Sequence, residues 1–245
     1  MRLLITLSYL GTNYHGWQVQ ANALTVQQAV QDALQSVFGS RLPLTGCSRT
    51  DSGVHAHTYC CHADCPDNSS VSPERVPDAL NAHLPRDISV RGCRVVPPDF
   101  HARYSVKSKT YEYTILNSPF RDPFLAPFAC HVRPELDFAA MKRAAKHFLG
   151  RHDFKSFQSA GSSVEDTVRD IMALDVRKAG DVITLSVTAD GFLYNMVRII
   201  AGTLIDVGRE AIKPADIPRI IEGCDRAAAG KTAPAHGLTL VDVNY

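Results

Sequence analysis

The sequence predicts an α+β fold of two similar lobes, each with a mostly antiparallel, mixed sheet and helices packed on one face. Residues 183–188 alternate apolar and polar side chains directly after a turn at Gly180 and Asp181, which indicates a hairpin with residues 167–178. Residues 26–37 instead carry an apolar stripe at helical spacing. Strands paired by short turns, with helices in separate runs, favour this class over a doubly wound parallel sheet.

The first lobe is predicted over residues 1–100. Thr25 and Gln28 form a capping box, so we expect a helix to begin there and to end near Gly39. Pro73 is favoured in the first turn of a helix, which indicates a second helix after it. The expected elements are strands at 2–9, 54–62 and 88–96 and helices at 26–37 and 74–81.

The second lobe is predicted over residues 101–245. Residues 97–100 break the periodicity and are the expected connection between the lobes. Residues 136–149 form a helix with an apolar face that we expect to pack on a sheet. The other expected elements are a strand at 110–116, the hairpin of 167–178 with 183–188, helices at 193–206 and 214–222, and a strand at 238–243.

Length and composition indicate a soluble globular protein. A chain of 245 residues can bury about 70% of its unfolded surface, and 45% hydrophobic with 21% charged residues is an ordinary balance. The longest apolar stretches, such as residues 199–205, are too short to cross a bilayer, and no signal peptide is expected. We therefore expect a cytoplasmic protein without a membrane partner.

The seven cysteines are expected to be reduced thiols, because their number is odd and no secretory signal is expected. Cys60, Cys61, His62 and Cys65 could be imagined as a zinc knuckle, but no second CxxC or HxxxH pair follows at the usual spacing. No metal site is therefore predicted.

The net charge of +1 falls short of the strongly basic balance that typifies nucleic-acid binders. Any RNA site must therefore be a local patch. Two basic runs are candidates, although such runs are usually solvated faces. They consist of Arg103, Lys107 and Lys109, and of Lys142, Arg143, Lys146, Arg151 and Lys155.

Residues 46–56 form a polar loop between two strand-like runs, with a glycine near each end. Asp51 offers an anionic oxygen as a nucleophile or base, and Arg49 offers a cation two residues away. Gly46 and Gly53 would let the backbone turn sharply. An Asx-turn with an exposed ion pair explains the same residues, and the chemistry alone favours that simpler interpretation.

This loop, Gly-Cys-Ser-Arg-Thr-Asp-Ser-Gly-Val-His-Ala, resembles the catalytic motif of the tRNA pseudouridine synthase A family. Five further blocks resemble the family's other motifs, in the family's order, and the resemblance covers nearly the whole chain. Leu10 departs from the pattern, because an acidic residue usually stands there. The five blocks are residues 9–18, 100–113, 152–157, 191–198 and 234–240.

The resemblance implies a pseudouridine synthase fold with the active-site cleft between the lobes. It implies that Asp51 is the nucleophile, that Tyr111 sits against the target base and that Arg198 pairs with the aspartate. It also implies that Arg49 assists base extrusion and contacts the RNA backbone. From the residues alone, Tyr111 is explained by a position in the core and Arg198 by a position on a helix surface.

The implied activity is the isomerisation of uridine to pseudouridine at tRNA positions 38, 39 and 40, by a homodimer across which the tRNA lies. The partner is tRNA recognised mainly by its shape, and not DNA. The reaction conserves mass, so no cofactor is expected, which agrees with the lack of a P-loop motif. A non-catalytic RNA-binding protein remains an alternative, as does a hydrolase with paired carboxylates.

Overall fold

The computed structural model describes residues 1–66, 71–162 and 164–245, which form two compact units. The first unit comprises Met1–Lys107 together with Leu240–Tyr245, and the second comprises Ser108–Thr239. This division differs from the lobes expected at 1–100 and 101–245, because residues 101–107 and 240–245, which include most of the last strand, lie in the first unit.

Hydrogen bonds join these two segments to each other and to the rest of the first unit, where Nδ1 of His62 accepts the Ala102 amide at 3.0 Å. The Lys107 amide donates to the carbonyl of Asn244 at 2.9 Å, and the Tyr245 hydroxyl donates to the carbonyl of Ala102 at 2.8 Å. The rings of Phe100 and Tyr245 pack with centroids 4.9 Å apart. These contacts join residues far apart in the sequence, so local periodicity carries no sign of them.

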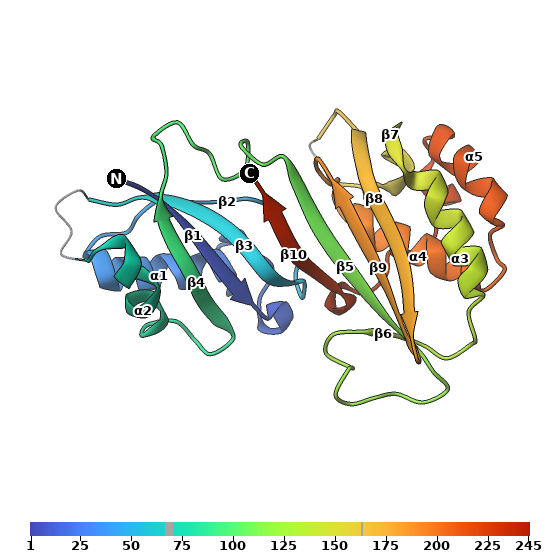
Figure 1. Ribbon diagram of the computed structural model, residues 1–245, viewed down its shortest axis with the longest axis horizontal. Helices are drawn as coiled ribbons and strands as arrows, with labels where there is room; N and C mark the ends of the chain where they lie inside the picture. Colours follow the sequence, from blue (N-terminus) through green and yellow to red (C-terminus); the bar gives the residue numbers. More distant parts are fainter. Residues whose placement is uncertain (67–70, 163) are drawn as a thin grey trace. The chain divides into compact units, whose positions relative to one another are not determined.

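The sheet of the first unit contains β1 (Arg2–Tyr9), β2 (Leu44–Gly46), β3 (His55–Asp64), β4 (Ile88–Val95) and β10 (Leu238–Asn244). β1 lies between β3 and β4 and is antiparallel to both, and β2 is antiparallel to β3 (Figure 1). β10 follows β3 in the strand order. The strands predicted at 2–9, 54–62, 88–96 and 238–243 are therefore confirmed.

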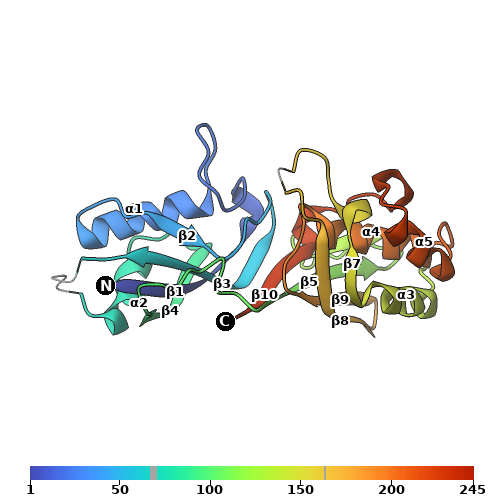
Figure 2. The same cartoon turned by 90° about the horizontal axis from the view of Figure 1, so that it is seen from above.

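The helices described in the first unit are α1 (Val26–Phe38) and α2 (Val76–Asn81). The Thr25 hydroxyl accepts the Gln28 amide at 3.3 Å, and Gly39 ends α1 with a φ of 76°, so the predicted helix is confirmed. α2 follows a 3-10 turn at Pro73–Arg75, which takes up the first turn predicted for that helix. Figure 2 shows α1 along one face of the sheet.

The sheet of the second unit contains β5 (Ser108–Asn117), β6 (Cys130–Val132), β7 (Gly150–Asp153), β8 (Val168–Ala179) and β9 (Val182–Ala189). β5, β9, β8 and β7 are antiparallel neighbours in that order, and β6 is parallel to β5 (Figure 1). The predicted hairpin is confirmed as β8 and β9. The alternating residues of β9 form part of the core, because Ile183, Leu185 and Val187 are fully buried.

The helices described in the second unit are α3 (Phe138–Ala145), α4 (Met196–Gly208) and α5 (Ile217–Glu222). α4 contacts β5 and α3 contacts β8, so the α+β class is confirmed. α4 begins later than the predicted 193, because Asn195 has a φ of 62°, outside the helical region. α3 is shorter than the predicted 136–149, because a 3-10 turn at Lys146–Phe148 follows it. A 3-10 turn at Pro214–Asp216 likewise precedes α5.

β2 is the strand-like run that was expected before the loop of residues 46–56. Two short strands, β6 and β7, were not predicted. They have three and four residues, too few to show an alternating pattern. Within the ranges that the structure describes, no helix is both long enough and apolar enough to span a bilayer.

Candidate active site

Asp51 and Arg49 lie in the loop that joins β2 to β3, in the first unit. Arg49 is exposed and Asp51 is half-buried. The loop turns at Gly53, whose φ of 80° lies in the left-handed region, and the Val54 amide donates to the carbonyl of Asp51 at 3.2 Å. The prediction that Gly53 permits a sharp turn is therefore confirmed.

The prediction of a sharp turn at Gly46 is wrong. This glycine is the last residue of β2, and its φ does not lie in the left-handed region. A Cβ at this position would overlap the Tyr59 hydroxyl and would lie 2.6 Å from Nε1 of Trp17. Glycine is required at residue 46 because two aromatic side chains pack directly against the backbone.

The chain between the first 3-10 turn (Gly11–Asn13) and α1 runs along the loop on both sides of Asp51. The Trp17 amide donates to the carbonyl of Thr50 at 3.1 Å. The carbonyl of Tyr14 accepts the Gly53 amide at 3.3 Å and the Ser52 hydroxyl at 3.2 Å. The residues before and after Asp51 are thus bonded to one neighbouring segment.

Gly16 permits this close approach. Its φ is 85°, and a Cβ there would lie 2.5 Å from the carbonyl oxygen of Thr50 and 3.2 Å from the carbonyl carbon of Asp51. Any other residue would be strained in its backbone and would push against the loop. The loop and the segment therefore form one closely packed piece of backbone.

Aromatic residues support the same loop from the core. The hydroxyls of Tyr9 and Thr50 form a buried hydrogen bond of 2.7 Å. Trp17 stacks on Tyr59 with centroids 4.0 Å apart, and the Tyr59 hydroxyl donates to the carbonyl of Ser48. Burial raises the pKa of Tyr59 well above its ordinary value, so its hydroxyl stays protonated and can donate.

Tyr111 lies on β5 in the second unit, opposite Val187 of β9. Its side chain is only 5% exposed, and it packs edge-on against Phe192 with ring centroids 5.1 Å apart. It shares its strand face with Tyr113 and Ile115, which are fully buried. The structure therefore places Tyr111 at the core of its unit, and its contact with a target base stays a prediction.

Arg198 is the third residue of α4, and hydrogen bonds hold its side chain in place. Its Nε donates to the carbonyl of Ala233 at 2.8 Å, and its Nη1 donates to Oδ1 of Asn195 at 2.6 Å. The Ala233 amide in turn donates to the carbonyl of Arg198 at 3.1 Å. Tyr194, predicted to lie one turn earlier in the same helix, precedes the helix instead.

The apolar face predicted for α4 is confirmed, since Val197, Ala201 and Leu204 are all buried. The guanidinium is therefore carried by a helix that is packed firmly into the second unit. Asp51 and Arg49 belong to one unit, and Tyr111 and Arg198 to the other. The predicted pairing of Arg198 with Asp51, and the predicted cleft, stay predictions.

The two basic runs provide surface charge in both units. Arg103 and Lys107 are exposed in the first unit, and Lys109 is half-buried in the second. The other run is exposed throughout and lies in the second unit; it consists of Lys142, Arg143, Lys146, Arg151 and Lys155. Their contact with RNA stays a prediction.

Two residues near the Asp51 loop had no role predicted for them. Tyr14 lies in a block that resembles the family's first motif, and Asp87 stands immediately before β4. The Tyr14 hydroxyl donates to Oδ1 of Asp87 at 2.6 Å. Because this hydrogen bond spans 73 positions, no local pattern could have revealed it.

Known proteins resemble this chain over its full length. A family model described as tRNA pseudouridine synthase matches residues 5–105 and 144–245. A tRNA pseudouridine synthase A of Ruminiclostridium cellulolyticum is 49% identical over 245 residues, covering 100% of this chain and 99% of the relative. That of Caldicellulosiruptor saccharolyticus is 47% identical over 243 residues, covering 99% of each chain. The chain therefore belongs to the tRNA pseudouridine synthase family.

Proposed function

We propose that this chain isomerises uridine to pseudouridine in tRNA, with the carboxylate of Asp51 as the nucleophile. Family membership supports the reaction. The observation that carries the assignment to Asp51 is the backbone around it. Thr50, Ser52 and Gly53 are all bonded to one neighbouring segment, so the intervening carboxylate is presented from a closely held loop.

In the proposed reaction, a uridine leaves its stack at a cost of a few kcal/mol. An oxygen of the Asp51 carboxylate forms a bond to C1′ of the ribose or to C6 of the base, and this bond is broken again before the product is released. The bond between C1′ of the ribose and N1 of the base breaks, and the base rotates while it stays bound. A bond then forms between C1′ and C5, the proton on C5 is released and N1 gains a proton. Atoms and charge balance without a redox partner or a nucleotide triphosphate.

The other candidate residues have distinct roles in this proposal. Stacking of the base on Tyr111 would recover about 1 to 3 kcal/mol of the cost of extrusion. Arg198 would pair with the carboxylate and lower its pKa, which keeps it ionised once water is excluded. Arg49, which is exposed, would contact the RNA backbone with its planar guanidinium. The target uridines would be at tRNA positions 38, 39 and 40.

Replacement of the nucleophile tests the proposal. Wild-type protein should release tritium from tRNA that carries tritium on C5 of uridine, whereas Asp51→Asn and Asp51→Ala should release none above background. Asp32→Asn is the matched control, because Asp32 lies on α1 in the same unit and its carboxylate pairs with the exposed Arg41 at 2.8 Å. Undiminished release by Asp51→Asn would disprove the assignment. Free uracil or a cut strand would identify a hydrolase, and tRNA binding without turnover a non-catalytic RNA-binding protein.

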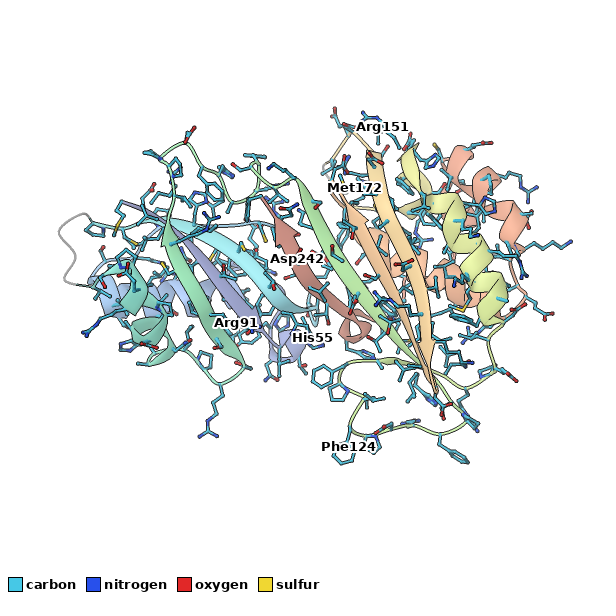
Figure 3. All side chains as sticks on the ribbon, in the orientation of Figure 1. His55, Arg91, Phe124, Arg151, Met172 and Asp242 are labelled. Atoms are coloured by element: carbon cyan, nitrogen blue, oxygen red, sulfur yellow. The ribbon has the colours of Figure 1, made fainter. Side chains whose placement is uncertain are left out.

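We also propose that two copies of the chain associate. The loop of residues 118–129 between β5 and β6 supports this, because it presents Phe120 and Phe124 at 80% and 89% exposure; Figure 3 shows Phe124 on this loop. Arg121 and Asp122 balance in charge, so the loop suits a second copy better than it suits a polyanion.

Molar mass in solution tests this association. Light scattering should give twice the chain mass for wild type and one chain mass for Phe120→Ser combined with Phe124→Ser. Tyr104→Ser, which also removes an exposed aromatic ring, should leave the mass unchanged. A wild-type monomer would contradict the proposal.

We propose the cytoplasm as the site of action. Cell fractionation that finds the protein elsewhere would contradict this proposal.

A further inference from the structure

We infer that Asp87 and Tyr14 are positioning residues for Asp51, acting through a chain of hydrogen bonds that ends on the catalytic loop. This inference rests on the proposed role of Asp51. The chain runs from the carboxylate of Asp87 to the hydroxyl of Tyr14, and from the carbonyl of Tyr14 to Ser52 and Gly53. All of these residues belong to the first unit.

The link between Tyr14 and the loop is made by the Tyr14 backbone. Its carbonyl accepts two hydrogen bonds from the residues directly after Asp51, the Ser52 hydroxyl at 3.2 Å and the Gly53 amide at 3.3 Å. The orientation of that carbonyl therefore affects where the loop turns. Tyr14 is 3% exposed, and the polar end of its side chain, the hydroxyl, is bonded to Asp87.

The link between Tyr14 and Asp87 is made by side chains. The Tyr14 hydroxyl donates to Oδ1 of Asp87 at 2.6 Å, a length typical of a hydrogen bond to a charged acceptor. Burial, together with this hydrogen bond, raises the pKa of Tyr14, so the phenol remains a donor. The ring is thus held at its far end by a charged partner.

Asp87 is itself well anchored. Its Oδ2 accepts the side-chain amide of Asn13 at 3.2 Å, and its carbonyl accepts the Leu10 amide at 2.9 Å. The next residue, Ile88, begins β4, the edge strand of the sheet, which is paired with β1. Asp87 therefore attaches the 3-10 turn and Tyr14 to the sheet.

The expected consequence is kinetic. A displacement of about 1 Å at a reacting group can slow a reaction as much as 100-fold. We expect Asp87→Asn and Tyr14→Phe each to slow single-turnover pseudouridine formation by between about 10-fold and 100-fold. The dissociation constant for tRNA should stay close to that of wild type, because the proposed action is on the loop and not on the RNA.

A double-mutant cycle separates one shared hydrogen bond from two independent effects. If both residues act through that bond, the combination of Asp87→Asn with Tyr14→Phe should be no slower than the slower single variant. Amide hydrogen exchange gives a readout independent of activity, and it should quicken at residues 50–53 in both single variants. Asp32→Asn and Tyr104→Phe are the matched controls and should behave as wild type.

Three outcomes would overturn the inference: a wild-type rate in either single variant, effects that multiply in the double variant, or a rate loss matched by an equal loss of tRNA affinity. If Asp87→Asn does not fold, Tyr14→Phe retains the buried ring and tests the same bond. Turnover by Asp51→Asn would instead refute the proposed function. An inactive Asp51→Asn together with a fully active Asp87→Asn would refute this inference alone.

Discussion

The Asp51 loop and the start of α4 hold their candidate residues in different ways. Around Asp51 the contacts are made mainly by backbone groups, and glycines at 16 and 53 allow the chain to come close or to turn. Arg198 is held by bonds from its own guanidinium to Asn195 and Ala233. The position of the Asp51 carboxylate should therefore depend on the backbone conformation of the loop. The position of the Arg198 guanidinium should depend on its individual hydrogen-bond partners.

The largest effect is expected from Gly16→Ala. The new Cβ would meet the Thr50 carbonyl at 2.5 Å, at a φ that costs a residue with a side chain about 1 to 3 kcal/mol. We expect a loss of folding stability of at least that size, with turnover slowed about 100-fold. Urea unfolding and tritium release measure the two effects.

Gly39→Ala is the matched control for Gly16→Ala. Gly39 also has a positive φ, of 76°, but nothing lies within 4 Å of the position its Cβ would take. Gly39→Ala should therefore lower the free energy of unfolding by the cost of the positive φ alone and leave the reaction rate unchanged. Equal rate losses in the two variants would show that close approach to the loop is unimportant.

The next largest effect is expected from Gly202→Ala in α4. Glycine to alanine within a helix normally stabilises by about 1 kcal/mol. Here the Cβ would overlap the carbonyl of Lys231, in the segment that leads to Ala233. We expect instead a loss of about 1 to 3 kcal/mol, from crowding in a packed site. A rise in the midpoint of thermal unfolding would contradict this packing.

Asn195 allows the backbone and side-chain contributions at α4 to be separated. Asn195→Ala should cost about 1 to 2 kcal/mol, because alanine is disfavoured at a φ of 62°. Asn195→Gly should keep most of the stability but lose the bond to Arg198, which would slow turnover about tenfold, the equivalent of about 1.4 kcal/mol. If both variants form pseudouridine at the wild-type rate, the hydrogen bond from Nη1 of Arg198 to Asn195 is not needed for the reaction.

The smallest effect is expected at Leu10, which precedes the 3-10 turn of Gly11–Asn13 and has no side-chain capping bond. The resemblance implies an acidic residue at this position, and the carboxylate of an aspartate can accept an amide of the turn. Leu10→Asp should raise the free energy of unfolding by about 0.5 kcal/mol. Leu24→Asp, at another exposed leucine, is the control. A lower free energy of unfolding for Leu10→Asp than for wild type would contradict this prediction.

The sequence was sufficient for the elements with a strong local pattern. The capping residue Thr25 and the terminal Gly39 marked both ends of α1, and alternation marked β1 and β9. It was insufficient where the pattern was too short, as in β6, or where one residue left the helical region, as Asn195 does before α4.

For the site, the motif singled out the Asp51 loop and the resemblance named Asp51 as the nucleophile, but neither indicated how the loop is held. Gly46 illustrates the difference. Its residue type suggested a turn, whereas the structure shows that Tyr59 and Trp17 leave no room for a side chain. Asp87 carried no signal at all, because its partner Tyr14 lies 73 positions away.

The sequence by itself determined the α+β class, most element boundaries and the family, because each is recorded in residues close together in the chain. Only the tertiary structure decided that residues 101–107 and 240–245 belong to the first unit, and that Tyr14 and Asp87 meet beside the loop. Such contacts depend on side chains and backbone groups brought together by folding, and local patterns contain no record of them.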